Sequence, residues 1–381
     1  MVFDFFRPID TDLLIDIQSF SAQTLGKRTV FNTEHEFPKL EGAKIAVIGV
    51  LENRGAGKSN DSNDLTSVRK EFYSLFPGNW NAQIIDLGDI VAGENIEDTY
   101  YVLKNAVAHL IKNNIIPIVI GGSQDLTYAM YRAYDQLEQM VNLVSVDSRF
   151  DFARENGTLA ESYLTKIIVD EPNNLFNFSN IGYQTYYNPQ EEIDLIEKLY
   201  FDAYRLGEVT SNQTVSEPVF RDADLVSIDM LSVCASSSGN FSDFVPNGFS
   251  GKEICSFARY AGISDKVTSF GIFNHNYSDA EASLIAQVMW YFIEGFHYRS
   301  NEYPFGTKEN YIKYIVTLED ELIFYKSDKT ERWWIEIPFL SNSHNKLKKA
   351  ALLPCTNQDY LEACAGSVPE RWWKAQRRNL L

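Results

Sequence analysis

The stretch "VNLVSVDSRFDF", residues 141–152, indicates the fold of this chain. An apolar run leads to Asp147, and a second aspartate, Asp151, follows four residues later. A short apolar run bounded by polar residues predicts a buried strand, with the acidic pair in the loop at its carboxyl end. In α/β proteins such strand ends carry the functional groups. Arg149 stands between the two aspartates, so the stretch is either a metal site or what is left of one.

Similar apolar runs recur along the chain and predict seven further strands. They lie at 43–50, 82–89, 115–122, 178–184, 201–209, 223–230 and 266–273. Helical patterns lie between most of them, at 64–76, 97–113, 125–139, 190–199, 251–262 and 279–297. Strands that alternate with helices predict a three-layer αβα fold, doubly wound around a mostly parallel, eight-stranded sheet.

The two ends of the chain have a different texture. Residues 1–42 are weakly patterned, and we expect an N-terminal arm packed on the α/β domain of residues 43–300. Residues 310–339, "NYIKYIVTLEDELIFYKSDKTERWWIEIPF", alternate in polarity, with turn-like breaks at "LEDE" and "KSDKT". This pattern predicts an antiparallel hairpin or meander, so we expect residues 301–381 to form a β hairpin and tail packed on the same domain.

Composition limits the classes of function. The 381 residues are 45% hydrophobic and carry a formal net charge of -18. An acidic chain of this kind argues against binding to nucleic acid or to an anionic membrane surface. The four cysteines form no CxxC pair, and neither a signal peptide nor an apolar run of membrane-spanning length is evident. We therefore expect a soluble cytoplasmic protein with reduced thiols.

The glycine-rich segment "VIGVLENRGAGKSND", residues 47–61, invites comparison with a phosphate-binding loop. The spacing of that motif requires a glycine at position 52, where this chain has Glu52. A carboxylate there would repel a phosphate. The segment therefore predicts an ordinary flexible surface loop after a strand.

Three strand ends, taken together, carry a resemblance to a known family. They read "GGSQD" at 121–125, "DSRFD" at 147–151 and "DMLS" at 229–232. Their order and spacing resemble the ureohydrolase family of arginase, agmatinase and formimidoylglutamase, in which the motifs are GGDH, DAHxD and SxDxD. The resemblance covers most of residues 43–297, including Arg69 and the stretch "VPNGFSGKEICSFARYAG". It implies an arginase-like fold and a site that holds two manganese ions through two histidines and four aspartates.

This chain departs from the family at several of those positions. The GGDH motif has Ser123 and Gln124 in place of its aspartate and histidine, and the DAHxD histidine is replaced by Arg149. Leu231 replaces the second aspartate of SxDxD, and in "SFGIFNHN" Phe273 stands where the family has a substrate-binding glutamate. The resemblance therefore implies a site that has lost most of its ligands, and we expect no cofactor and no manganese pair.

Three of the family's six ligands are kept, namely Asp147, Asp151 and Asp229. We expect the Arg149 guanidinium to lie at a lost metal position and to pair with these carboxylates. If one ion is still bound, its ligands would be Asp147, Asp151, Asp229 and Gln124, a set of oxygens that suits Mg²⁺ or Ca²⁺. The ordinary alternative is that Asp147 and Asp229 form turns, and that Asp125 caps a helix.

None of the histidines falls at a ligand position; they are His35, His109, His275, His297 and His344. His109 is expected to be a packing or surface residue of a helix. His275 follows a strand end and is the one with a seat near the expected crevice, although an ordinary loop role is the alternative.

Two tryptophan pairs could mark a partner-binding surface. For Trp333 and Trp334 we expect one ring on the core, because neighbouring strand residues point to opposite faces. In the tail, Arg371, Trp372 and Trp373 form a candidate contact patch, since aromatic residues and arginine are enriched at interfaces. The alternative is that the tail packs on its own domain.

Three functions follow from these features. The first is a catalytically inactive ureohydrolase-fold protein, retained as a binding or scaffold component, with a protein partner or a second copy of the chain. The second is a metal-dependent amidine hydrolase of the formimidoylglutamase or agmatinase type with an altered site. The third is a small-molecule sensor that uses the old pocket, with Arg149 binding a carboxylate of the ligand.

Overall fold

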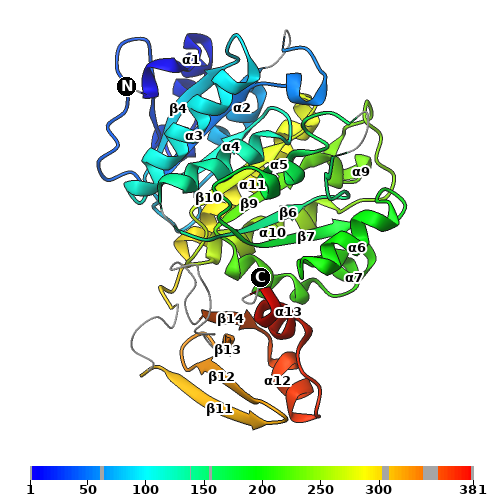
Figure 1. Cartoon of the computed structure of the whole chain (residues 1–381). Helices are drawn as coiled ribbons and strands as arrows, with labels where there is room; N and C mark the ends of the chain where they lie inside the picture. The colour runs from blue at the N-terminus through cyan, green and yellow to red at the C-terminus, as the bar shows by residue number, and fades with distance from the viewer. Residues whose placement is uncertain are drawn as a thin grey trace.

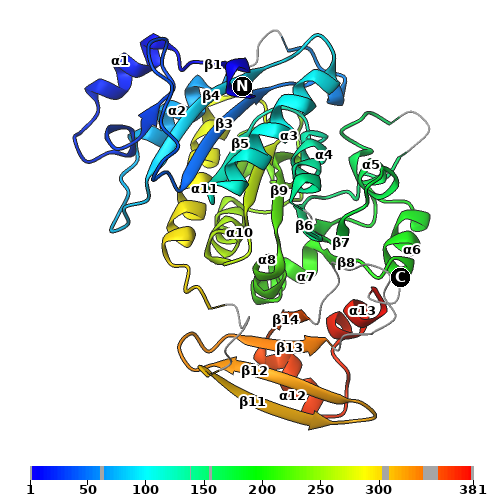
Figure 2. The same cartoon turned by 60° about the vertical axis from the view of Figure 1, so that its left-hand side comes forward.

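A computed structural model describes residues 2–60, 64–137, 139–153, 157–302, 309–337 and 351–378. Figures 1 and 2 show a large α/β body and, below it, a smaller C-terminal unit of strands and helices. No helix in these residue ranges is long and apolar enough to cross a membrane.

The body is built around one ten-stranded sheet of order β1-β4-β3-β5-β10-β9-β6-β7-β8, with β2 beside β4. All eight predicted strands are present and pair in parallel. They are β3 (Ile45–Leu51), β4 (Ile84–Val91), β5 (Ile116–Ile120), β6 (Val141–Val146), β7 (Leu175–Tyr183), β8 (Asp202–Arg205), β9 (Leu225–Asp229) and β10 (Ser269–Phe273). The sheet is larger than the predicted eight strands because β1 (Phe6–Arg7) and β2 (Val30–Phe31) join it from the N-terminal segment. Each has two residues, which is too short to give a periodic signal.

Helices cover both faces of this sheet and give the predicted three layers. One buried apolar cluster lies under α1 (Thr11–Ser19), α2 (Thr66–Ser74), α7 (Leu206–Ser211), α8 (Glu217–Asp222), α10 (Gly251–Ile263) and α11 (Asp279–His297). A second lies under α3 (Ile96–Lys112), α4 (Leu126–Arg132), α5 (Tyr163–Val169) and α6 (Gln190–Lys198). The short helix α9 (Ala235–Ser238) follows β9. Because both faces are covered, central strands such as β3 and β5 are buried along their whole length.

Local sequence sets where the long helices begin. The α10 helix starts at a capping box in which Ser250 accepts from the Glu253 amide while the Glu253 carboxylate accepts from Ser250. The α3 helix has the same device in Asn95 and Asp98. Each cap thus fixes the first turn of a helix that follows a strand of the sheet, β4 for α3 and β9 for α10.

The C-terminal unit is a four-stranded antiparallel sheet with two helices. The strands are β11 (Tyr311–Thr317), β12 (Glu321–Ser327), β13 (Trp333–Ile337) and β14 (Ala351–Cys355), and the helices are α12 (Asn357–Cys364) and α13 (Glu370–Arg378). The turns after β11 and β12 fall at the predicted breaks, so the meander is confirmed. The sequence did not predict β14 or the two helices, since "LLPC" is short and contains a proline.

Both faces of this small sheet are covered, which corrects the expectation for the first tryptophan pair. Trp333 is 7% exposed and stacks on Tyr360 of α12. Trp334 is 1% exposed because the Arg221 guanidinium of α8 lies 4.7 Å from the centre of its ring. The two rings do point to opposite faces, but the body of the protein covers the second face.

Buried arginines join the unit to the body. Arg221 donates to the carbonyl oxygens of Trp333 and Cys355, at 3.1 and 2.9 Å, and pairs with Glu217. Arg378, near the end of α13, donates to the Tyr200 carbonyl and lies 3.8 Å from the Asp202 carboxylate. Each guanidinium thus bridges segments that are far apart in the chain.

Candidate functional site

The predicted site residues meet where four neighbouring strands, β5, β10, β9 and β6, reach their carboxyl ends. Gln124, after β5, donates its side-chain amide to Ser227 at 3.0 Å and its backbone N–H to the Asn274 side chain at 3.2 Å. Asn274, after β10, in turn donates to Asp229 Oδ2 at 2.9 Å. The structure therefore connects the three strand ends through Asn274, a residue that the sequence analysis did not single out.

Asp147 and Asp229 each also form a local turn, as the ordinary alternative predicts. Asp147 Oδ1 accepts the Arg149 backbone N–H at 2.8 Å, and Asp229 Oδ1 accepts that of Leu231 at 2.7 Å. Asp151 has a left-handed backbone conformation, with φ of 57°, which is uncommon outside glycine. Asp151 lies near enough to Asp147 for its charge to act on the Asp147 carboxyl.

Burial disfavours the charged form of all three carboxyls. The pKa of Asp151 is raised to about 8, first by burial and then by the charge of Asp229. Burial and the charge of Asp151 raise the pKa of Asp147 well above its usual range, and burial and the charge of Asp147 do the same for Asp229. The acidic residues thus form one electrostatic group, which we call the acidic site (Asp147, Asp151 and Asp229).

The expected pairing of the Arg149 guanidinium with these carboxylates is wrong. The guanidinium lies over the ring of Tyr187, 4.7 Å from its centre, and no ion pair joins it to Asp147, Asp151 or Asp229 in the described part of the chain. A partly exposed arginine can stack on an aromatic face and stay hydrated, whereas pairing with the carboxylates would require it to be buried. Its charge still lowers the pKa of Asp147 and Asp151 from a distance.

Leu231 and Phe273 supply no polar group to the site. Leu231 contributes only its backbone N–H. Phe273 is fully buried and belongs to the apolar cluster under α3 and α4. The ring lies so close to Gly271 that a Cβ there would come within 2.5 Å of Phe273 Cε2, so the side chain fills the core.

The residues present do not fit a pair of manganese ions. Both histidine positions and one aspartate position lack a ligand, and the described part of the chain contains no group of three or more His, Cys, Asp or Glu that could hold a metal ion. Two carboxylate oxygens already accept backbone N–H groups. Asp147 Oδ2 and Gln124 Oε1 are buried and have no hydrogen-bond partner within the described ranges. These two acceptors call for a donor or a cation.

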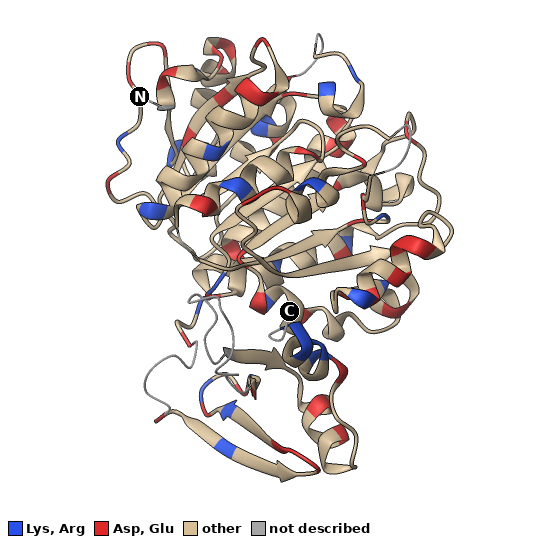
Figure 3. Ribbon diagram, in the orientation of Figure 1, with Lys and Arg blue, Asp and Glu red and all other residues tan. Residues whose placement is uncertain are grey.

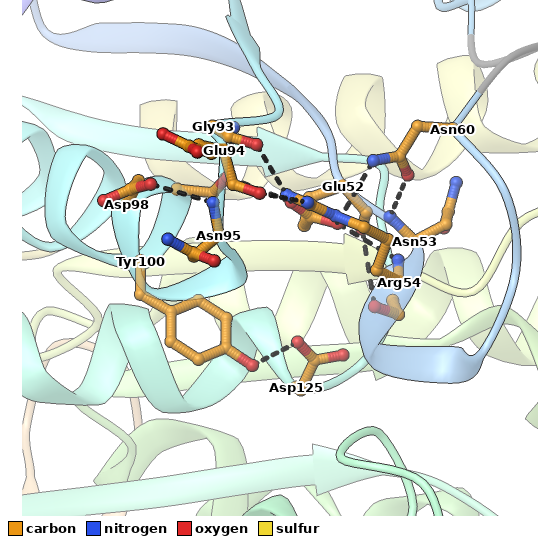
Figure 4. Close-up of polar contacts among 12 residues, drawn as sticks. Glu52, Asn53, Arg54, Asn60, Gly93, Glu94, Asn95, Asp98, Tyr100 and Asp125 are labelled. Carbon is orange, nitrogen blue, oxygen red and sulfur yellow. Dashed lines mark hydrogen bonds and ion pairs between the residues drawn. The ribbon is translucent and has the colours of Figure 1, made fainter.

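The loop at residues 52–60 is more ordered than the surface loop that its sequence predicts. Glu52 is fully buried and receives both arms of the Arg54 guanidinium, at 2.9 and 2.6 Å, as Figure 4 shows. Burial alone would raise the pKa of Glu52, but hydrogen bonds from Arg54, Asn60 and Thr99 hold it below its usual value. In the sequence, Glu52 and Arg54 are two residues apart, which could have indicated this ion pair. A carboxylate and a guanidinium at that spacing are more often both exposed, so the sequence did not predict a buried pair.

Asp125 does not cap helix α4, contrary to the alternative considered from the sequence. Its side chain makes no capping hydrogen bond, and it accepts the hydroxyl of Tyr100 instead (Figure 4). Gly55 packs directly on this carboxyl, because a Cβ at Gly55 would lie 2.0 Å from Asp125 Oδ1. The 52–60 loop therefore rests on Asp125, next to the strand end that carries Gln124.

Of the four histidines in the described residues, three are exposed and only His275 is buried. His35, His109 and His297 are exposed, and His344 lies outside the described residues. His275 is 5% exposed, and its Nδ1 accepts the Tyr277 backbone N–H at 3.3 Å. Burial lowers the pKa of His275 to about 3, so the ring is neutral. It lies beside Gly121, after β5.

The second tryptophan pair is largely committed to contacts within the chain. Trp372 is 3% exposed and donates to the Glu336 carbonyl at 2.8 Å, and Arg371 donates to the Pro354 carbonyl at 2.8 Å. Trp373 is 41% exposed and packs edge-on against Tyr200. The candidate patch is therefore reduced to one exposed ring.

Comparisons with known proteins agree with the resemblance. A model of the arginase family matches residues 25–293. Formimidoylglutamase of Staphylococcus aureus (strain JH9) is 22% identical over 262 residues, covering 65% of this chain and 82% of the relative. The residues after 293, including the whole C-terminal unit, lie outside the match to the family model.

Solved structures show the same fold. Formiminoglutamase of Trypanosoma cruzi with Mn²⁺ superposes with a TM-score of 0.60 at 18% identity, covering 69% of this chain and all (100%) of that one. Formimidoylglutamase of Bacillus subtilis gives 0.61 at 15% identity, with 70% and 91% covered. Agmatine ureohydrolase of Thermoplasma volcanium gives 0.57 at 18% identity, with 74% and 97% covered.

Proposed function

The chain belongs to the arginase family, and from that premise we propose that it is a catalytically inactive member, retained as a binding component of a protein assembly. The observation that carries the proposal is the donor set at the strand ends. Gln124, Arg149 and Leu231 stand at three of the six ligand positions that the family resemblance implies. Of these, only the glutamine offers an oxygen toward a metal.

The state of the remaining carboxyls supports inactivity. A metal-free hydrolase needs a general base to activate water near neutral pH. Burial and the charges of neighbouring carboxyls raise the pKa of Asp147 and Asp229 well above the usual range, which disfavours the ionised carboxylate that a general base requires. The three retained aspartates thus stand at the family's ligand positions, but they are poorly suited to act as a general base without a metal.

The C-terminal unit supports a role in an assembly. It is an addition to the part of the chain that matches the family model, and buried arginines fix it to the body. Figure 3 shows acidic and basic residues spread over the body, and a cluster of basic residues in α13 of this unit.

The test combines metal analysis with an activity assay. Purified protein, dialysed after incubation with Mn²⁺, should retain far less than one ion per chain by elemental analysis. It should release neither formamide from formiminoglutamate nor urea from arginine or agmatine, with or without added Mn²⁺. Stoichiometric manganese or turnover of any of these compounds would refute the proposal.

The alternative function is an amidine hydrolase with an altered site. It is favoured by the relatives named above, three of which are described as formimidoylglutamases or formiminoglutamases. If it is correct, a guanidino or formimino compound should be turned over, and Asp147→Asn should abolish that turnover. An Arg259→Gln variant, altered in a partly exposed ion pair with Glu294, is a control that should keep full activity.

A further inference from the structure

Large aromatic side chains are exposed beside the acidic site. Phe241 and Phe244 are 70% and 62% exposed and stack on each other, with ring centres 6.5 Å apart. Tyr186 is 65% exposed. Isolated apolar residues on a surface are common, but several large rings together mark an interaction surface. We call Phe241, Phe244 and Tyr186 the aromatic rim.

Hydrogen bonds tie the rim together around the end of β9. Asn247 donates to the Tyr186 hydroxyl at 3.0 Å, and its carbonyl accepts from Gln184 at 2.9 Å. The loop that carries both phenylalanines then returns at Phe249, whose N–H donates to the Ser232 carbonyl at 2.9 Å. Ser232 follows Asp229 by three residues, so the rim is anchored next to the acidic site.

An ion pair connects the rim to the 52–60 loop on the other side. Asp243, between the two phenylalanines, pairs with Lys58 at 3.3 Å. The charge of Lys58 also lowers the pKa of Asp229, one carboxyl of the acidic site. Both side chains are about half exposed, at 53% and 41%, so the contact can open at low cost.

Two buried acceptors at the site have no donor in the described chain. Gln124 and Asp147 are 0% and 1% exposed, and Gln124 Oε1 and Asp147 Oδ2 make no hydrogen bond there. Arg149, the nearest cation in sequence, is turned onto Tyr187. Asp151 and Asp229 keep 5% exposure each, so the group is in contact with solvent. A site with carboxyls and unpaired acceptors is complementary to a cation that also donates hydrogen bonds.

We infer that the aromatic rim and the acidic site together bind a segment of a partner protein in which an arginine or lysine is flanked by apolar residues. This inference rests on the proposed function, because it requires that no metal pair occupies the site. The basic side chain supplies donors to Asp147 Oδ2 and Gln124 Oε1, and its apolar neighbours cover Phe241, Phe244 and Tyr186. A bare metal ion would satisfy the acceptors but would leave the rings exposed.

A library of random dodecapeptides, displayed on phage and selected against the full chain in the presence of EDTA, tests the inference. Selected peptides should share an arginine or lysine next to aromatic or aliphatic residues. In a synthetic copy of a selected peptide, replacing that arginine by citrulline, which has the same shape without the charge, should weaken binding by about tenfold or more. Selection of peptides without a basic residue, or of none at all, would overturn the inference.

Two variants with a control locate the site. Asp147→Asn keeps the Oδ1 acceptor for the Arg149 N–H but turns the unpaired Oδ2 into a donor, so it should fold and lose the selected peptides. Phe244→Ala should weaken them by removing part of the rim. Phe76→Ala, which removes a 56%-exposed ring from the α2–β4 connection, should bind as the wild type does. Equal binding by Asp147→Asn would contradict the inference.

The failure of this inference differs from that of the proposed function. Metal retention and turnover of a formimino or guanidino compound would refute inactivity, whatever peptides are selected. An inactive, metal-free protein that selects only neutral or acidic peptides would refute the basic partner alone. Binding that Mn²⁺ abolishes, with Mn²⁺ held stoichiometrically, would show that a metal is the occupant.

Discussion

At the scale of single residues, the sequence predicted which residues lie together at the site, but it did not predict where the Arg149 side chain points. The positions of Asp147, Asp151 and Asp229 follow from strand ends that belong to one parallel sheet, and the structure brings them together. The Arg149 side chain turned the other way because Tyr187, from a loop 38 residues later in the sequence, offers it an aromatic face near solvent. Contacts between segments decide such rotamers, and a single sequence does not contain them.

Glu281 leads to a prediction about pH at the same scale. It is fully buried near the start of α11, where Oε2 accepts the Asn276 N–H, and burial raises its pKa from 4.5 to about 7. Unfolding releases the proton of a raised acid, so its stabilising contribution is present below pH 4.5 and is lost as pH rises through 7. Glu281→Gln, which keeps an acceptor for Asn276, should therefore increase the free energy of unfolding at pH 8, by up to about 3 kcal/mol.

Urea unfolding of wild type and Glu281→Gln at pH 5 and pH 8 measures this effect. The difference between the two proteins should be larger at pH 8. The Asp279→Asn variant removes a surface charge from the same helical turn and is the control for loss of charge alone. A benefit of Glu281→Gln that is greater at pH 5 would contradict the prediction.

The pair in the 52–60 loop gives a second prediction for single residues. Arg54→Leu would leave the fully buried Glu52 carboxylate without its guanidinium, retaining only Asn60 and Thr99 as side-chain donors. Removing one partner of a buried pair is costly because the other charge stays buried, so we expect a loss of about 2–4 kcal/mol in the free energy of unfolding. Lys58→Leu breaks the exposed pair with Asp243 and should change stability by less than about 1 kcal/mol. Urea unfolding compares the two, and similar losses would contradict the argument.

At the scale of elements, the periodicity of the sequence predicted the longer strands and helices of the body but missed the two-residue strands. The eight strands and six helical patterns of the body were visible because each repeats its pattern over several residues. The two-residue strands β1 and β2 exist only because β4 offers them backbone partners. Both rings of the Trp333–Trp334 pair are buried because α8 covers the second face of the small sheet, a contact between elements more than a hundred residues apart.

The contact between α8 and the C-terminal sheet should be testable through Arg221. Replacing it by leucine would leave the carbonyls of Trp333 and Cys355 without their donor and Glu217 without its closest partner. Unsatisfied buried groups cost about 1–3 kcal/mol each, so we expect a loss of at least about 2 kcal/mol. Hydrogen exchange should speed up in β13 and β14 before it does in β3 or β5.

Arg259→Leu is the matched control for this experiment. Its guanidinium pairs with Glu294 on the surface of the body, with 39% of the side chain exposed. It should leave exchange in β13 and β14 unchanged. Protection that falls equally throughout the chain in Arg221→Leu would show that the unit does not open separately from the body.

At the scale of the whole molecule, the chain combines a conserved fold with an altered site, and the two can be separated experimentally. The variant Gln124→His, Arg149→His, Leu231→Asp restores three donors on a sheet whose strand ends already hold Asp147, Asp151 and Asp229. Imidazole and carboxylate are suitable ligands for Mn²⁺, and the restored aspartate adds an anion to offset the ion's charge. We expect this variant to retain Mn²⁺ after dialysis where the wild type does not. The melting temperature should rise with Mn²⁺ concentration, because an ion that binds only the folded chain stabilises it by mass action.

A second variant, with alanine at the same three positions, removes the guanidinium and the leucine without adding donors. Elemental analysis of both variants and the wild type then decides whether missing donors or an unsuitable fold excludes the metal. Equal retention of Mn²⁺ by the alanine variant would show that the donors are not what the site lacks.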